Sequence, residues 1–213
     1  MFDKQREMLA KRLRYELNLS DRVYEAIRKV PRHLFVPPEY RSEAYVDTPL
    51  PIGYGQTISA PHMVAIMCEL LKLKEGEKVL EIGTGCGYHA AVVAEIVGKK
   101  GKVVTIERIP ELAEMAKRNL EALGYDNVLV VVGDGSKGYK PEAPYDKIYV
   151  TASAPDVPKP LAEQLKPGGI MVLPIGRYSQ WLYVVRKDER GNLHKENWGA
   201  VRFVLLKGEY GFD

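Results

Sequence analysis

The amino-acid sequence predicts an α/β fold: a doubly wound, mostly parallel sheet, with extra N-terminal helices before it and a terminal antiparallel strand pair. From residue 78 onward, short runs of apolar residues alternate with segments of helical length and pattern. This alternation is typical of parallel strands covered by helices on both faces. A glycine-rich turn follows the first of these strands, and the last two apolar segments have no helix between them.

The composition is that of an ordinary globular protein. The chain has 213 residues, of which 46% are hydrophobic and 28% charged. A chain of this length can bury a full core without disulfides or metals. We expect a single domain over residues 1–213, in which residues 1–75 hold N-terminal helices and a long loop, and residues 76–213 hold the α/β core and the C-terminal strands.

Charge and cysteine content argue against nucleic-acid and metal partners. The net charge is +3, and lysine and arginine are interleaved with acidic residues, whereas a dedicated nucleic-acid binder more often has a basic block. Cys68 and Cys86 offer no disulfide framework and no metal cluster. No apolar run reaches membrane-spanning length. We expect a cytoplasmic monomer without nucleic-acid, membrane or metal partners, and the scarcity of asparagine favours a thermophilic source.

The predicted elements follow in a regular order. Residues 2–30 have helical spacing, prolines then end the helices, and residues 45–59 are predicted as a loop rich in Pro and Gly. Pro61 begins a third helix. The core is expected as strand Lys78–Ile82, helix Tyr88–Val97, strand Lys102–Ile106, helix Pro110–Leu123, strands Val128–Val132 and Lys147–Val150, helix Lys159–Leu165, strand Ile170–Pro174, and an antiparallel pair Trp181–Lys187 and Val201–Leu206.

The strongest motif is the glycine-rich turn in residues 79–87. Glycines let the backbone approach a ligand closely and adopt positive φ. The dinucleotide fingerprint G-x-G-x-x-G does not fit, because the third glycine comes one residue early. The spacing G-x-G-x-G after an acidic residue resembles the first motif of class I S-adenosylmethionine methyltransferases. The candidate cofactor residues here are Glu81, Gly83, Thr84, Gly85 and Gly87.

Polar residues also follow the next strands. Glu107 ends the second strand, where a carboxylate can accept hydrogen bonds from both ribose hydroxyls. Asp134-Gly135 follows the third strand, where Asp134 is either an acceptor for the adenine amino group or part of a plain turn. Thr151 follows the fourth strand and completes the candidate cofactor set.

The segment that begins at Thr151 also bears on the methyl acceptor. It reads Thr-Ala-Ser-Ala-Pro, without the Asn/Asp-Pro-Pro-aromatic sequence found in many enzymes that methylate amino groups of bases or glutamine. No strong general base and no metal cluster stand out. A carboxylate acceptor fits this absence, because its pKa of roughly 3–4 leaves it ionised at neutral pH.

Three further segments carry a more specific resemblance. They are Phe35-Val36-Pro37, the stretch from Pro49 to Met63 that contains Thr-Ile-Ser-Ala-Pro-His-Met, and Leu165-Lys166-Pro167-Gly168-Gly169. Together with the glycine turn they closely resemble the protein-L-isoaspartate O-methyltransferase family over nearly the whole chain. The glycine motifs are shared with many methyltransferases, so the stretch from Pro49 to Met63 is the most specific part.

The resemblance implies a Rossmann-like methyltransferase that uses S-adenosyl-L-methionine to esterify the free α-carboxylate of isoaspartyl residues in damaged proteins and peptides. It implies Ser59 as the active-site residue, Thr57 as the matching threonine, and the C-terminal segment around Arg202-Phe203-Val204 as the part that holds the substrate backbone. Ile58, between Thr57 and Ser59, and His62, in the first turn of the next helix, are also expected on the substrate side. The residues alone leave simpler roles open: Ser59 could only cap a helix, and His62 could be a packed or surface histidine. Other possible functions are a same-fold methyltransferase for RNA or a small molecule, and a non-catalytic S-adenosylmethionine-binding protein.

Overall fold

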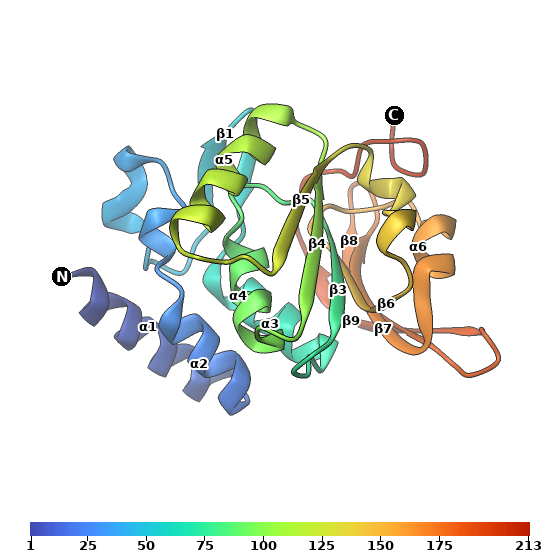
Figure 1. Cartoon of the computed structure of the whole chain (residues 1–213), viewed down its shortest axis with the longest axis horizontal. Coiled ribbons are helices and arrows are strands. Elements are labelled where there is room, and N and C mark those ends of the chain that lie inside the picture. The colour runs from blue at the N-terminus through green and yellow to red at the C-terminus, as the bar shows by residue number, and fades with distance from the viewer.

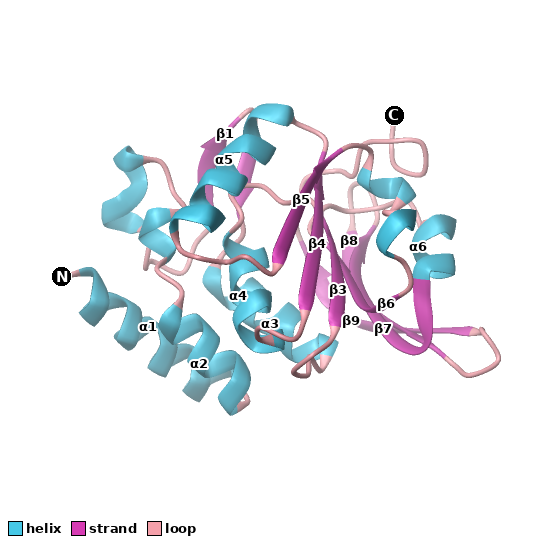
Figure 2. Ribbon diagram, in the orientation of Figure 1, coloured by secondary structure: helices cyan, strands magenta, loops and turns pink.

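The computed structural model describes residues 1–213 and consists of one large sheet with helices on both faces, beside a small hairpin (Figures 1 and 2). The seven strands of the large sheet lie in the order β5-β4-β3-β6-β7-β8-β9. The five strands β5, β4, β3, β6 and β7 run parallel to one another. Strand β8 pairs antiparallel with β7, and β9 pairs antiparallel with β8. The strands are β3 (Lys78–Ile82), β4 (Lys102–Glu107), β5 (Val128–Val132), β6 (Tyr145–Val150), β7 (Leu165–Ile175), β8 (Gln180–Lys187) and β9 (Leu193–Val201). The predicted doubly wound, mostly parallel sheet is confirmed.

The helices match the sequence pattern closely, and proline begins several of them. Pro61 and Pro110 occupy first helical positions, where the missing N–H has no intrahelical partner to lose. The helices are α1 (Phe2–Leu17), α2 (Asp21–Lys29), α3 (Pro61–Leu71), α4 (Tyr88–Val97), α5 (Pro110–Ala122) and α6 (Lys159–Gln164), with short 3₁₀ turns η1 (Arg32–Leu34), η2 (Pro38–Glu43), η3 (Gly135–Lys137) and η4 (Lys140–Glu142). None of them is long and apolar enough to cross a bilayer.

The prediction of a continuous loop over residues 45–59 is wrong. Part of it forms an antiparallel hairpin of β1 (Leu50–Gly53) and β2 (Gln56–Ile58). The turn residues Tyr54 and Gly55 both have positive φ, of 55° and 69°, as a tight two-residue hairpin turn requires. A tyrosine rarely adopts this conformation, so the pattern Gly53-Tyr54-Gly55 does not match the usual signals of a two-residue hairpin turn.

The prediction for the last strand is also wrong. The first member of the expected pair lies within β8, but the second is β9, which ends at Val201 where the expected strand began. Nearly every side chain of β9 is exposed, so the strand has no buried face to produce an apolar pattern. The apolar residues 203–206 instead cross the carboxyl ends of the strands, where Leu205 forms a bridge to Ser153.

Two apolar cores lie on opposite faces of the sheet. The larger includes Leu13 of α1 and Ile27 of α2 together with Val79 of β3 and the inner face of α4. The smaller includes Leu80 and Ile82 and reaches α6. The N-terminal helices and the sheet therefore share the larger core.

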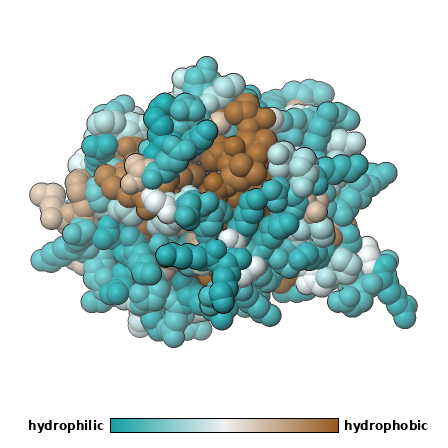
Figure 3. Space-filling view, viewed as in Figure 1, coloured by the Kyte–Doolittle hydropathy of each residue, from teal (hydrophilic) through white to brown (hydrophobic).

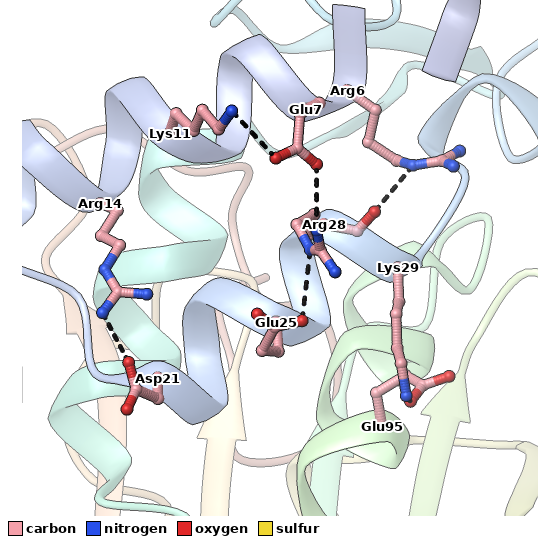
Figure 4. A network of polar contacts seen from close by, with 9 residues as sticks. All are labelled: Arg6, Glu7, Lys11, Arg14, Asp21, Glu25, Arg28, Lys29 and Glu95. Atoms are coloured by element: carbon pink, nitrogen blue, oxygen red, sulfur yellow. Dashed lines mark hydrogen bonds and ion pairs between the residues drawn. The ribbon is translucent and has the colours of Figure 1, made fainter. Parts of the chain in front are cut away.

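The outer surfaces of α1, α2 and α4 are joined by ion pairs (Figure 4). Arg28 of α2 contacts Glu7 of α1 at 3.5 Å and Glu25 at 3.2 Å, and Lys29 contacts Glu95 of α4 at 3.5 Å. Exposed pairs of this kind each contribute at most about 1 kcal/mol, although networks matter more at high temperature. A thermophilic source stays a prediction.

The sheet ends on one side in an apolar edge. All five residues of β5 are Val or Leu, and none is fully buried. Figure 3 shows an apolar patch on this face of the molecule, where Figure 1 places β5. On its inner side β5 pairs with β4 alone.

Candidate active site

The candidate site lies at the carboxyl ends of β3, β4 and β6. From β3 the chain winds through β4 and β5 toward one edge, whereas β6 and β7 wind toward the other. In open α/β sheets the crevice at such a reversal is where ligands bind. Here it holds a cavity of about 500 Å³ and a smaller adjoining one of about 70 Å³.

The glycine turn forms the floor shared by both cavities. Gly83 has a φ of +92°, and a β-carbon there would lie 2.3 Å from Oγ1 of Thr151. The Thr151 hydroxyl bonds the carbonyls of Ile82 and Gly83 at 3.0 and 2.7 Å, so the ends of β3 and β6 are held together. Gly83, Gly85 and Thr151 line both cavities. A β-carbon at position 83 would displace the Thr151 hydroxyl from these two carbonyls.

Glu107 lies beside this floor at the end of β4. It is only 6% exposed, and it lines the smaller cavity together with Gly135. Its carboxylate accepts hydrogen bonds from the N–H groups of Gly85 at 2.9 Å and Ile109 at 3.1 Å. Each carboxylate oxygen has two lone pairs, so each retains one acceptor position after these bonds.

Three of the expected cofactor residues do not line either cavity. Gly87 has a φ of +92°, and a β-carbon there would crowd Ala116 and Leu120 of α5 at 3.3 Å. This glycine therefore permits helix packing and does not contact the cleft.

Asp134 stabilises the chain around it. One of its oxygens accepts bonds from the N–H and hydroxyl of Ser136 at 3.0 and 2.6 Å, and the other accepts from the N–H of Glu209 at 2.9 Å. These bonds fasten the C-terminal segment over η3. The turn role left open in the sequence is therefore the one that the contacts support.

Glu81 is buried beneath the glycine turn, at 0% exposure. Its carboxyl oxygens accept hydrogen bonds from the hydroxyls of Thr105 and Tyr149, both at 2.6 Å. Thr105 in turn lies 2.6 Å from the hydroxyl of Thr84 in the turn. Burial raises the pKa of Glu81 to about 8. The acidic residue of the motif thus supports the turn from below, whereas Thr84 lines the larger cavity.

The opposite wall of the larger cavity contains all five residues expected on the acceptor side, which are Thr57, Ile58, Ser59, His62 and Val204. The simpler role of Ser59 as a helix cap is wrong, because Ala60 is the N-cap of α3 and no side chain caps it. Asp47 fixes His62 in place. Its Oδ1 lies 2.9 Å from the backbone nitrogen of His62 and 3.0 Å from Nδ1 of the His62 ring.

His89 is a cavity residue that the sequence analysis missed. It lines the larger cavity from the first turn of α4 and is 7% exposed. Burial lowers its pKa to about 3, so it is neutral. Its Nε2 lies 3.6 Å from Sγ of Cys68, and its Nδ1 is buried without a partner. A lone histidine in an apolar helix gives no motif, which is why it was overlooked.

Comparison with known proteins agrees with this geometry. The family model described as protein-L-isoaspartate(D-aspartate) O-methyltransferase matches residues 3–211. The chain belongs to this family. Among its relatives, protein-L-isoaspartate O-methyltransferase 2 of Archaeoglobus fulgidus is 76% identical over 99% of this chain and 96% of its own length. The enzyme of the same name from Methanopyrus kandleri is 60% identical over 100% and 96%.

Solved structures of the family are also similar. A protein-L-isoaspartate O-methyltransferase that is 36% identical superposes with a TM-score of 0.91 over 97% of this chain and 67% of its own. A Plasmodium falciparum protein described as a member of the family, solved in complex with S-adenosyl-L-homocysteine, is 29% identical, with a TM-score of 0.84 over 95% of this chain and 98% of its own.

The buried Glu81 generates a prediction about pH. Between about pH 5 and pH 8 the carboxyl is ionised in the unfolded chain but still protonated in the folded one. The folded state then binds more protons, so its stability falls as pH rises, by at most about 1.4 kcal/mol per pH unit. Glu81→Gln cannot titrate, so we expect its stability to fall less across this range. Urea unfolding of both proteins at pH 5 and pH 8 measures the difference, and parallel pH profiles would contradict the assignment.

Proposed function

We infer that this chain transfers a methyl group from S-adenosyl-L-methionine to the free α-carboxylate of L-isoaspartyl residues in damaged proteins and peptides. The observation that supports it most directly is the meeting of two walls in one cleft. One is the glycine turn with Glu107, and the other is the segment from Thr57 to His62. The wall with Glu107 suits an adenosyl donor, and the wall from Thr57 to His62 contains the residues that the resemblance to the family assigns to the acceptor.

The residues of the cleft indicate which part of the donor each wall would hold. Glu107 retains an acceptor position on each oxygen, which suits the two ribose hydroxyls, and Gly135 lines the same cavity, where the base would lie. Gly83, Thr84 and Gly85, which line the larger cavity, would hold the methionine part. When bound, the sulfonium supplies an already activated methyl group.

The acceptor needs orientation and no proton removal. We propose that the Ser59 hydroxyl donates a hydrogen bond to one carboxylate oxygen, leaving the other in line with the donor methyl. That oxygen forms the new C–O bond while the C–S bond breaks, and the electron pair of the broken bond returns to sulfur. Thr57, Ile58, His62 and Val204 surround the acceptor.

We propose a monomer as the acting species, because one chain carries the residues of both the donor wall and the acceptor wall. A net charge of +3 without a basic block supports a protein or peptide substrate over nucleic acid. Both free cysteines are buried, and they suit a reducing cytoplasm. We propose that the protein works there without a membrane partner.

The function is tested by a methyl-transfer assay with matched isoaspartyl and aspartyl peptides. We expect a base-labile methyl ester on the isoaspartyl peptide and little reaction with the aspartyl one. The two differ by one methylene moved from side chain to backbone, so only geometry can separate them. Equal rates would contradict the substrate assignment, and transfer to RNA or small acids in parallel assays would favour the other methyltransferase functions. Cofactor binding without turnover would favour a sensor.

Glu107→Ala tests the donor site. Losing two hydrogen bonds to a charged acceptor should cost roughly 3 kcal/mol, which corresponds to about a hundredfold weaker binding. Calorimetry with S-adenosyl-L-homocysteine measures it. The control is Glu111→Ala, an exposed residue of α5 outside the cleft, which should bind normally. Unchanged affinity in a folded Glu107 variant would remove this residue from the site.

Ser59→Ala tests the acceptor site. Misplacing reacting atoms by about 1 Å can cost roughly 10²-fold in rate, so we expect a large loss of turnover with nearly unchanged cofactor affinity. Ser59→Thr retains the hydroxyl but adds a methyl group and should give an intermediate rate. Single-turnover kinetics with the isoaspartyl peptide distinguishes the three proteins. A normal rate in the alanine variant, or a covalent adduct on Ser59, would refute the orienting role.

A further inference from the structure

Arg32, at the start of η1, is an unusual residue to find in the interior. It is 0% exposed, although its side chain is charged. Its guanidinium donates hydrogen bonds to three backbone carbonyls: Nε to Ala44 at 2.9 Å, Nη1 to Ser59 at 2.9 Å and Nη2 to Thr48 at 3.3 Å. All three acceptors are uncharged.

The guanidinium has no carboxylate partner. The acidic residue of the neighbouring loop, Asp47, pairs with His62 and Arg12 instead. The remaining neighbour is the ring of Tyr88, whose centroid lies 5.0 Å from the guanidinium carbon. Burying a cation without a counter-charge is costly, and burial lowers the pKa of Arg32 accordingly. The three hydrogen bonds offset part of that cost, because an apolar residue here would leave the three carbonyls without a donor.

The three carbonyls show what the arginine does. Ala44 and Thr48 lie at the beginning of the segment that contains the β1–β2 hairpin, and Ser59 lies at its end. Between them are residues that line the acceptor side of the cavity, such as Thr57 and Ile58. A guanidinium presents its donors in a rigid planar fork. One side chain therefore fixes both ends of the segment relative to each other.

We propose that Arg32 is a positioning residue for methyl transfer, which holds the carbonyl of Ser59 so that the hydroxyl of the same residue points at the acceptor carboxylate. This rests on the orienting role of Ser59 given above. The bond to the carbonyl restrains the backbone of Ser59, and the side chain then has a limited set of rotamers. Lysine retains the charge but has no fork, so it cannot hold all three carbonyls in the same way.

The test is a double-mutant cycle of Arg32→Lys with Ser59→Ala, read as the single-turnover rate on an isoaspartyl peptide at saturating S-adenosyl-L-methionine. We expect Arg32→Lys to lower the rate by roughly 10- to 100-fold in the wild-type background. In the Ser59→Ala background it should lower the rate less than about threefold, because the group it positions is gone. S-adenosyl-L-homocysteine should bind with nearly wild-type affinity, measured by calorimetry.

Leu13→Ala is the matched control for general destabilisation. Leu13 is fully buried in the same core but lies on α1, outside the cleft. At a temperature where both proteins are folded, this variant should keep a near-wild-type rate. If Arg32→Lys does not fold, Arg32→Gln replaces it in the same cycle, since a neutral amide removes the cost of the buried charge and also lacks the fork.

The outcomes separate the two levels of the proposal. A wild-type protein inactive on the isoaspartyl peptide would refute the proposed function itself. An active wild type in which the Arg32 substitution reduces the rate equally with and without the Ser59 hydroxyl would refute the positioning role alone. A wild-type rate in Arg32→Lys, or an equal loss in Leu13→Ala, would refute it as well.

Discussion

The contact between Gly83 and Thr151 is the constraint on which the site depends. The two residues end neighbouring parallel strands from which the chain winds in opposite directions. Because position 83 has no β-carbon, the Thr151 hydroxyl can bond the carbonyl of Gly83 at 2.7 Å. The strand ends stay together, and the crevice opens directly above them. The donor and acceptor walls are both built around this floor.

Polar side chains that bond the backbone determine where the two segments above the floor lie. Gln180 bonds both the N–H and the carbonyl of Phe203, at 2.6 and 3.0 Å, and Asp134 holds the N–H of Glu209. Arg32 does the same for the segment that ends at Ser59. In each case a polar side chain bonds backbone, which satisfies groups that a loop over an apolar core would otherwise leave unpaired. These bonds therefore fix the two segments above the floor of the cleft.

The sequence predicted those parts of the site that follow from local rules. The alternation of strands and helices placed Gly83, Glu107 and Thr151 at strand ends, and parallel strands bring such ends to one edge. The supporting role of Glu81 and the bond from Asp134 to Glu209 could not be predicted, because they depend on partners distant in the chain: Tyr149 is 68 residues from Glu81, and Glu209 is 75 residues from Asp134. The β1–β2 hairpin was missed because Tyr54 adopts a positive φ, and β9 because its side chains are exposed.

The chemistry explains why so much of the structure serves orientation. A sulfonium donor is already activated and a carboxylate acceptor is already ionised, so the protein has little bond-breaking assistance to provide. What remains is to hold two reacting atoms in line, and rates are steeply sensitive to that geometry. Arg32 bonds three carbonyls and so restrains the backbone on the acceptor side. Glu81 and Thr105 support the glycine turn and so restrain the donor side. The buried side chains of Arg32 and Glu81 are both costly to the folded state. Arg32 lies behind the acceptor wall and Glu81 behind the donor wall, and the methyl group passes between these two walls.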